Sequence, residues 1–105
     1  MASEALAVRD NPAHHRFEIT LDDGKVAVAE YVLRPDKILF THTGVPEGHE
    51  GKGIATALVR FALDAARERG LTVIPACPFV ADYMKKHAEV QDLLDPAWRE
   101  RLGLD

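Results

Sequence analysis

The 105-residue sequence has only one cysteine, Cys77. A single cysteine excludes a disulfide within the chain and any zinc site built from several thiolates. The histidines lack the spacing of metal ligands, so we expect no metal. The apolar run ALAV (5–8) is too short for a secretory signal and follows Glu4. These features favour a reducing, cytoplasmic setting.

Positive charge and long apolar runs are also scarce. Thirteen Lys and Arg residues oppose seventeen Asp and Glu residues, which gives a formal net charge of −4. Nucleic acids and anionic membrane surfaces both require an excess of cationic side chains, so neither is an expected partner. No apolar run approaches the length of a membrane span. The 47% of apolar residues suffices for one core, and we expect a single domain over 1–105 that is a monomer or a weak homodimer.

The first half of the chain has the alternating pattern of β-strands. In RFEITLDDGKVAVAEYVLR (16–34), two alternating arms flank Asp23-Gly24, which is a strong hairpin signal. The segment KILFTHTGV (37–45) is rich in β-branched and aromatic residues and predicts a third strand. Residues 1–13 are small and polar and predict a loose lead-in. The chain therefore opens with a predicted antiparallel meander of three strands.

The pattern then changes to a helical period. An amphipathic helix of about four turns is predicted before Gly70, because apolar residues recur on one face. The members of this face are Ile54, Leu58, Phe61, Ala62 and Ala65. The segment LTVIPA (71–76) predicts a strand buried on both faces. Strands 37–45 and 71–76 should then be parallel neighbours in a β-α-β crossover.

Two more helices are predicted near the C-terminus. Pro78 fits the first position of a helix over 79–87, and Asp95-Pro96 fits the cap and first turn of a short helix over 97–102. The predicted fold class is therefore α/β, a mixed sheet with an antiparallel N-terminal meander, a β-α-β crossover and two to three helices.

Two glycines stand directly before the long helix, in EGKGIATALV (50–59). Glycine at a helix start is unfavourable by about 1 kcal/mol relative to alanine, so the pair indicates either a tight turn or a close approach to a ligand. Free N–H groups at a helix N-terminus, with Lys52 beside them, can bind a phosphate. A Walker loop is excluded because Lys52-Gly53 has the wrong order. A dinucleotide fingerprint is excluded because Thr56 replaces its third glycine.

The stretch from Glu50 to Ala55 resembles the Gln/Arg-x-x-Gly-x-Gly/Ala motif of the GNAT superfamily of N-acetyltransferases, although Glu50 replaces Gln or Arg. Three further segments resemble a minimal single-domain branch of that superfamily with a Cys-Pro-Phe turn. They are RFEITLDDGKVAVAEYVL, ILFTHTGVPEGHEGKGIATALV and VIPACPFVADYMKKHAEV, and the resemblance covers residues 16–94.

This resemblance implies an acetyl-CoA-dependent N-acetyltransferase that acts on an amine. The branch lacks the N-terminal helices that shape the acceptor pocket in larger members, as this chain does. The identity of the acceptor is therefore open, and an acyl-CoA-binding or sensing module with little turnover is the alternative.

The resemblance also implies where coenzyme A would bind. The strands on either side of the long helix would splay apart, and the pantetheine arm would lie between them like an added strand, bound by the backbone of Thr43 and Val45. The pyrophosphate would be held by Gly51, Lys52, Gly53, Ile54, Ala55 and Thr56. Lys85 and Lys86 would either reach the adenosine phosphates or form a solvated charged face.

Three side chains are candidates for the chemistry, each with a structural alternative. By resemblance, Tyr83 is the general acid near the coenzyme sulfur; otherwise it is a partly buried aromatic residue. Cys77 is expected at the N-cap of the helix that begins at Pro78, where a thiol gains thiolate character. It would accept the acetyl group or contact the thioester, or else it is inert packing.

His42 lies in the predicted strand just before the segment that would contact pantetheine. It would deprotonate the incoming ammonium, or it is a core histidine bonded to the backbone. The remaining histidines are expected on the surface: His14, His15, His49 and His87.

Overall fold

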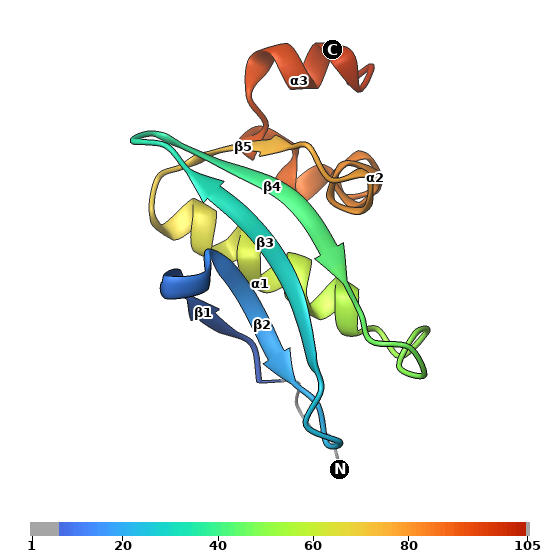
Figure 1. Cartoon of the computed structure of the whole chain (residues 1–105). Coiled ribbons are helices and arrows are strands. Elements are labelled where there is room, and N and C mark those ends of the chain that lie inside the picture. Colours follow the sequence, from blue (N-terminus) through green and yellow to red (C-terminus); the bar gives the residue numbers. More distant parts are fainter. Residues whose placement is uncertain (1–6, 105) are drawn as a thin grey trace.

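A five-stranded mixed sheet organises the chain, with its strands in sequence order. The computed structural model describes residues 7–104 (Figure 1). The strands are β1 (Arg9–Asn11), β2 (Arg16–Thr20), β3 (Val26–Leu33), β4 (Lys37–Gly44) and β5 (Thr72–Pro75). Strands β1 to β4 pair antiparallel, and β5 pairs parallel with β4. The predicted meander and the predicted parallel crossover are both confirmed.

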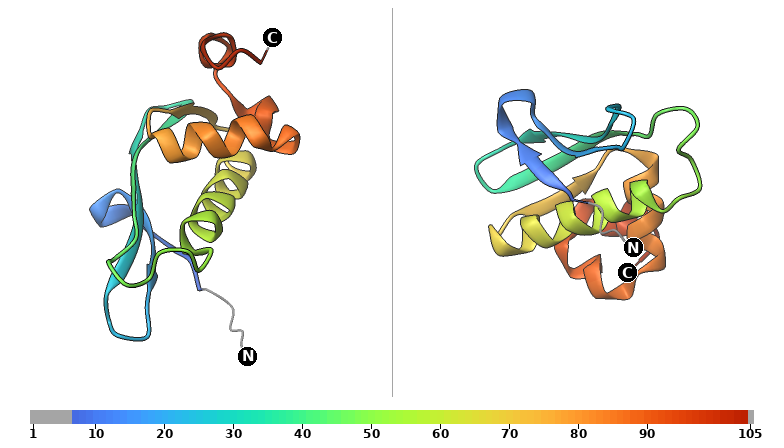
Figure 2. Two further views of the ribbon diagram at one scale, coloured as in Figure 1. Left: turned by 90° about the vertical axis from the view of Figure 1, so that its right-hand side faces the viewer. Right: turned by 90° about the horizontal axis from the view of Figure 1, so that it is seen from below.

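Three α-helices and two 3-10 turns accompany this sheet in the described part of the chain. They are α1 (Ile54–Glu68), α2 (Pro78–Lys86) and α3 (Pro96–Arg101), with 3-10 turns η1 (Pro12–His14) and η2 (Ala88–Leu93). With the sheet seen edge-on, α1 and α2 lie on one side and the blue η1 segment lies on the other (Figure 2, left). We call the side that faces away from α1 the outer face. Within residues 7–104, no helix combines the length and the apolar character needed to span a membrane.

The turns form where the sequence predicts them. Gly24 has a φ of +85°, and the Leu21 N–H donates to the Lys25 carbonyl at 2.8 Å, which closes the β2–β3 hairpin. Gly70 ends α1 with a φ of +69°, and the Leu71 N–H behind it donates to the Ala66 carbonyl at 2.9 Å. This is the Schellman arrangement, which satisfies the last carbonyls of a helix.

The buried face of α1 differs from the predicted one. Phe61 is exposed, although its ring still meets the edge of Phe17 with centroids 5.9 Å apart. The buried side chains are Ile54, Leu58, Val59, Ala62, Leu63 and Ala66. The buried face of α1 is therefore rotated by part of a turn from the predicted one, because Val59 and Leu63 are buried in place of Phe61 and Ala65.

The N-terminal segment also differs from the predicted loose lead-in. Residues 1–6 lie outside the described part of the chain, but Arg9–Asn11 form strand β1 on the edge of β2. The Tyr31 hydroxyl donates to Asp10 Oδ1 at 2.6 Å, and Arg69 at the end of α1 donates to Asp10 Oδ2 at 2.9 Å. Polar contacts between distant parts of the chain hold this strand, and a local hydropathy pattern does not reveal them.

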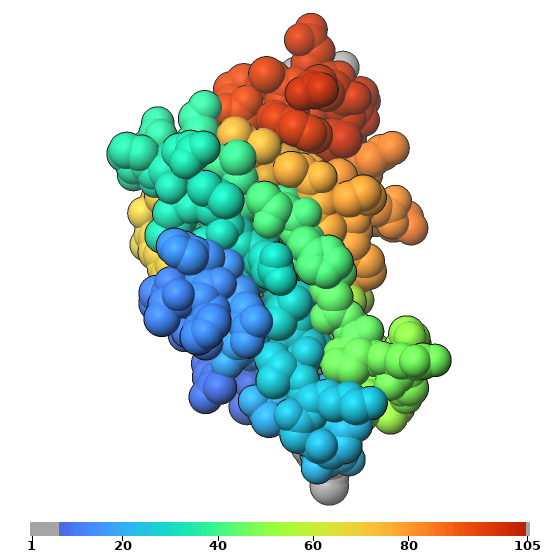
Figure 3. Space-filling view, in the orientation of Figure 1, coloured from blue at the N-terminus to red at the C-terminus, as the bar shows by residue number. Residues whose placement is uncertain are grey.

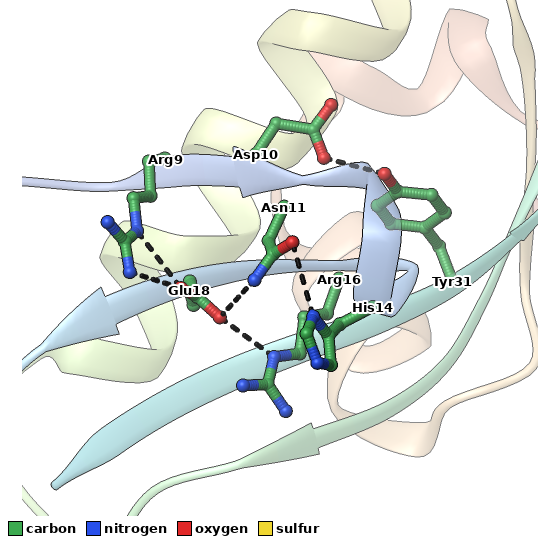
Figure 4. Close-up of polar contacts among 7 residues, drawn as sticks. All are labelled: Arg9, Asp10, Asn11, His14, Arg16, Glu18 and Tyr31. Atoms are coloured by element: carbon green, nitrogen blue, oxygen red, sulfur yellow. Dashed lines mark hydrogen bonds and ion pairs between the residues drawn. The ribbon is translucent and has the colours of Figure 1, made fainter.

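A buried carboxylate completes this attachment (Figure 4). Glu18 is 2% exposed on the outer face of β2. Arg9 Nη2 lies 2.6 Å from Glu18 Oε1, Arg16 Nε lies 2.8 Å from Oε2, and Asn11 Nδ2 lies 3.3 Å from Oε2. The hydrogen bond from Arg16 is the largest of the causes that lower the pKa of Glu18 to about 2, against the opposing effect of burial. The ionised carboxylate therefore fastens β1 to β2.

The Glu18 network predicts a pH-dependent contribution to stability. The folded-state pKa of about 2 lies below the ordinary value of 4.5, so the stabilisation is complete above pH 4.5 and is lost as the pH falls toward 2. Glu18→Gln is expected to lower the free energy of unfolding at neutral pH by about 1–3 kcal/mol. Urea denaturation at several pH values should show this difference shrinking below pH 4.5.

The exposed Glu68 is a control, because Glu68→Gln changes the charge equally and should leave the stability nearly unchanged. A loss in Glu18→Gln that stays constant across the acidic range would contradict the role assigned to the ionised carboxylate.

Candidate active site

Strand β4 contains a β-bulge at Thr41. In the β3–β4 pair, Glu30 lies opposite His42 and Tyr31 lies opposite Phe40, so Thr41 has no partner. A bulge shifts the alternation of side chains by one residue. Phe40 faces the core before the bulge, and Thr43 takes the helix-facing side after it. His42 is consequently exposed on the outer face.

Strands β4 and β5 separate directly after Phe40. Their last pair is Phe40 with Pro75, after which the Cys77 N–H donates to the Phe40 carbonyl at 2.8 Å and α2 begins. Proline has no N–H, so Pro75 and Pro78 do not extend the ladder. Because the bulge resets the alternation, we expect the peptide groups of Thr43 and Val45 to face the open edge. The splay implied by the family resemblance is present.

The loop between β4 and α1 depends on left-handed glycines. Gly48, Gly51 and Gly53 have φ values of +91°, +81° and +77°, a conformation unfavourable for other residues by about 1–2 kcal/mol per residue. A Cβ on any of them would meet nothing within 4 Å, so the space above the loop is open. The turn therefore requires these glycines, and it also leaves their backbone accessible.

The N-terminus of α1 has no side-chain cap among the described residues. Its N-cap is Gly53, and its first turn contains no acidic residue. The N–H groups that begin a helix have no acceptor within it and carry a partial positive charge. These donors, at residues 54–56, can therefore bind an external anion.

A hollow of about 370 Å³, which we call the inner hollow, lies between this N-terminus and the open edge of β4. Thr43 and Val45 form one wall, the glycine loop and the first turn of α1 form another, and the exposed Phe79 of α2 forms a third. A second hollow of about 240 Å³, the α2 hollow, shares Thr56 and Phe79 with it and continues past Tyr83 and Lys86. The two together form an extended surface along α2.

His49 ties the glycine loop to the β2–β3 hairpin, where the sequence had predicted a surface residue. Its side chain is 12% exposed, and its Nε2 lies 2.8 Å from Asp23 Oδ2. This hydrogen bond is the largest cause of a lowered pKa for Asp23. The possible ligand atoms of Asp22, Asp23 and His49 lie within 4.8 Å of one another. The hydrogen bond joins Asp23 and His49, and Asp22 is the sequence neighbour of Asp23.

Glu50 shapes the same loop. The Gly48 N–H donates to Glu50 Oε1 at 2.9 Å, so this carboxylate holds the turn from within. This contact gives a structural reason for an acidic residue where the family motif has Gln or Arg.

The structure corrects the expected accessibility of Cys77. It is the N-cap of α2, as predicted, but it is 4% exposed and makes no side-chain capping bond. Its Sγ lies 3.4 Å from Thr43 Oγ1. Thr43 lines the inner hollow, whereas Cys77 does not. The thiol is therefore packed behind Thr43.

Tyr83 and His42 lie on different surfaces. Tyr83 is buried beside the α2 hollow, where its ring stacks on His87 with centroids 4.0 Å apart. Burial is the main cause of a raised pKa for Tyr83, so its hydroxyl stays protonated at neutral pH. The alternative of a core histidine at position 42 is wrong, because His42 is exposed. The three predicted catalytic residues are therefore not gathered at one point.

The two lysines of α2 also differ from each other. Both are exposed, but only Lys86 lines the α2 hollow, and its Nζ lies 3.0 Å from Asp82 Oδ2. Sequence reasoning missed Phe79, His49 and the Thr41 bulge as parts of the site. Phe79 was detectable, since it follows Pro78 at the exposed start of a helix, but the other two depend on contacts between segments distant in sequence.

Comparison with known proteins assigns the chain to a family. Residues 16–93 match the family described as GCN5-related N-acetyl-transferase. Protein NATD1 of Danio rerio is 30% identical over 94 residues, which cover 87% of this chain and 84% of that protein. Protein NATD1 of Mus musculus is 30% identical over 86 residues, covering 78% and 76%. The solution structure of a GCN5-like protein from Staphylococcus aureus matches with a TM-score of 0.68 and 25% identity, covering 86% of this chain and 88% of that one. The chain belongs to the GCN5-related N-acetyltransferase family.

We expect the His49–Asp23 contact to keep the glycine loop ordered. Asp23→Ala removes a hydrogen bond worth about 1 kcal/mol, which corresponds to roughly fivefold faster amide exchange in the loop. The amides to follow are those of Gly48 and His49, which are bonded within the loop. Hydrogen-exchange NMR measures the change.

Two further variants isolate the contact. Asp22→Ala removes a neighbouring carboxylate with no hydrogen bond among the described residues and should leave the exchange unchanged. Asp23 also accepts from the Lys25 N–H, so His49→Ala should reproduce the faster Gly48 exchange without disturbing that turn. Equal exchange in Asp23→Ala and wild type would contradict the role of the contact.

The packing of Cys77 predicts slow alkylation by iodoacetamide in the native protein and fast alkylation in urea. Thr43→Ala should accelerate the native reaction because it removes the side chain between the thiol and the inner hollow. Thr41→Ala is the matched control on the exposed bulge and should have no effect. Mass spectrometry follows the adduct; a native rate equal to the rate in urea would show that Cys77 is accessible.

Proposed function

We propose that this member of the GCN5-related N-acetyltransferase family transfers an acetyl group from acetyl-CoA to a primary amine. One observation carries the proposal: an uncapped helix N-terminus and an unpaired strand edge border the same hollow. The first can bind a phosphate group, and the second can bind an extended chain of amides. Coenzyme A contains both.

The pyrophosphate is proposed to bind to the backbone donors from Gly51 to Thr56. The left-handed glycines present no Cβ toward this group, and the exposed Lys52 adds a positive charge. The pantetheine amides are proposed to pair with Thr43 and Val45, as an added strand would. Lys85 and Lys86, both exposed near the end of α2, are proposed to reach the adenosine phosphates from the solvent side.

The reaction needs an unprotonated amine and a proton for the departing thiolate. The amine nitrogen attacks the thioester carbon, a C–N bond forms, and the C–S bond breaks. Tyr83, kept protonated by its raised pKa, is proposed to give its hydroxyl proton to the thiolate, and the second proton that the nitrogen loses as the amide forms passes through water to restore that hydroxyl. His42, exposed on the outer face, is proposed to take the proton of the incoming ammonium directly or through water.

We assign no covalent step to Cys77. A thiol that is 4% exposed behind Thr43 does not present its sulfur to the inner hollow. Its proposed role is to support Thr43 where the strands separate. Transfer is therefore direct, from the thioester to the amine.

An acyl-CoA-binding or sensing module is the second candidate function. The observation in its favour is the separation of Tyr83 from His42, which lie on different surfaces of the chain. Release of free thiol from acetyl-CoA, measured with and without a panel of primary amines, distinguishes the two. Amine-dependent release above the hydrolysis background excludes a module without turnover.

A pair of glycine variants tests the coenzyme site. Gly53 and Gly70 flank α1 with φ values of +77° and +69°, and a Cβ on either would meet nothing within 4 Å. Alanine at either position should destabilise the fold by a similar amount, about 1–2 kcal/mol. Only Gly53→Ala should also weaken coenzyme A binding, by about tenfold or more, because it displaces donors to the pyrophosphate.

Calorimetric titration with coenzyme A measures the affinities, and thermal unfolding measures the stabilities. Equal losses of affinity in the two variants would show that the effect is general destabilisation. A wild-type protein that coenzyme A neither binds nor stabilises against heat would contradict the proposed function.

A further inference from the structure

A third hollow, of about 500 Å³, opens on the outer face, and the proposed coenzyme site does not use it. We call it the outer hollow. It lies between η1 and strands β3 and β4, and its lining includes Pro12, His14, Glu30, Val32, Leu33 and Thr41. Figure 3 looks onto this side of the molecule, with the N-terminal segment in blue beside β3 in teal.

The carboxylate of Glu30 lies in this hollow without a partner. Among residues 7–104 it makes no hydrogen bond or ion pair, although the side chain is half-buried. Arg16 is directly opposite Glu30 across the β2–β3 pair, but its Nε binds Glu18 Oε2 at 2.8 Å. Arg9 binds Glu18 as well, and neither arginine makes a hydrogen bond or ion pair with the Glu30 carboxylate among the described residues. An external cation can therefore take the position beside Glu30.

The rest of the hollow suits an alkyl chain. Val32 and Leu33 are 37% and 45% exposed and belong to the few large apolar side chains on the described surface. A ligand that matches both features carries an ammonium group on an aliphatic chain, since the ammonium is attracted to Glu30 and the chain covers apolar surface.

The outer hollow is next to the proposed site of transfer. Thr41 lines the outer hollow and Thr43 lines the inner hollow, on opposite faces of the same strand. Neighbouring strands lie about 4.8 Å apart, so Glu30 on β3 lies roughly one to two strand spacings from the open edge of β4. An ammonium held by Glu30 is too far from that edge to react, but a second amine on the same short chain reaches it.

We propose that the outer hollow binds one ammonium of an aliphatic diamine, with Glu30 as its counter-charge, while the other amine reaches the open edge of β4 and accepts the acetyl group. This inference rests on the proposed acetyl transfer and names its acceptor class. Glu30 makes and breaks no covalent bond. It is a specificity-determining residue that favours a diamine over a monoamine of equal length.

Binding is tested first, without acetyl-CoA. Titration of isotope-labelled protein with 1,5-diaminopentane should shift the amide signals of Val32, Leu33 and Thr41. Glu30→Gln should weaken this binding about tenfold, as expected for loss of a charge-assisted contact. Glu68→Gln, the same change at an exposed position of α1, should leave it unchanged. The proposal is overturned if the chemical shifts of these amides do not change, or if Glu30→Gln binds the diamine as tightly as the wild-type protein does.

Turnover provides the second test. In the wild-type protein, the KM for 1,5-diaminopentane should lie below the KM for 1-aminopentane. Glu30→Gln should raise the diamine KM to the level of the monoamine KM. The KM values for 1-aminopentane and acetyl-CoA should not change. Diamine binding with no effect of Glu30→Gln on the diamine KM overturns the acceptor role. If the wild-type protein neither binds coenzyme A nor turns over acetyl-CoA, the proposed function is wrong. In that case the amine titration still decides whether the outer hollow binds a diamine.

Discussion

The missing partner of Thr41 in the β3–β4 pair determines how both faces of this sheet are used. The single extra residue turns Thr43 to the helix side and leaves His42 on the outer face. It coincides with the end of β4–β5 pairing at Phe40, so the strand gains a free edge at the position where its alternation changes. One strand thereby contributes to the proposed coenzyme site on one side and to the proposed acceptor site on the other. Without the bulge, His42 and Gly44 would face the helices and Thr43 would face solvent.

The sequence predicted the parts of the fold that local patterns encode. The alternation of apolar and polar residues predicted the meander, and the change to a helical period predicted α1. Gly24 and Gly70 have the positive φ values that turns at these glycines were expected to need. The bulge was not predictable, because Thr41 is a good strand residue and its lack of a partner depends on pairing with β3. Strand β1 was not predictable either, since its attachment uses Asp10, Glu18 and Arg69 from three separate elements.

The candidate site was predictable to a similar extent. The glycine loop and the edge at Thr43 follow from the family motif, and the structure brings both to one hollow. The reactivity expected for Cys77 rested on its N-cap position, which is confirmed, but position in a helix does not determine burial behind a neighbouring strand. Glu30 could not be singled out from the sequence, because it stands in an alternating strand pattern. It becomes a candidate because its half-buried carboxylate has no partner among the described residues.

The central claim is that the open edge of β4 and the N-terminus of α1 bind one coenzyme A molecule. Amide NMR spectra recorded during titration with coenzyme A test this most directly, because the open edge of β4, the first turn of α1 and the outer face of β3 have separate amide signals. The account predicts large shifts at Thr43, Val45 and the amides from Gly51 to Thr56, and small ones at Glu30 and Val32, whose side chains lie on the outer face. Shifts confined to the outer face, or absent from the first turn of α1, would contradict it.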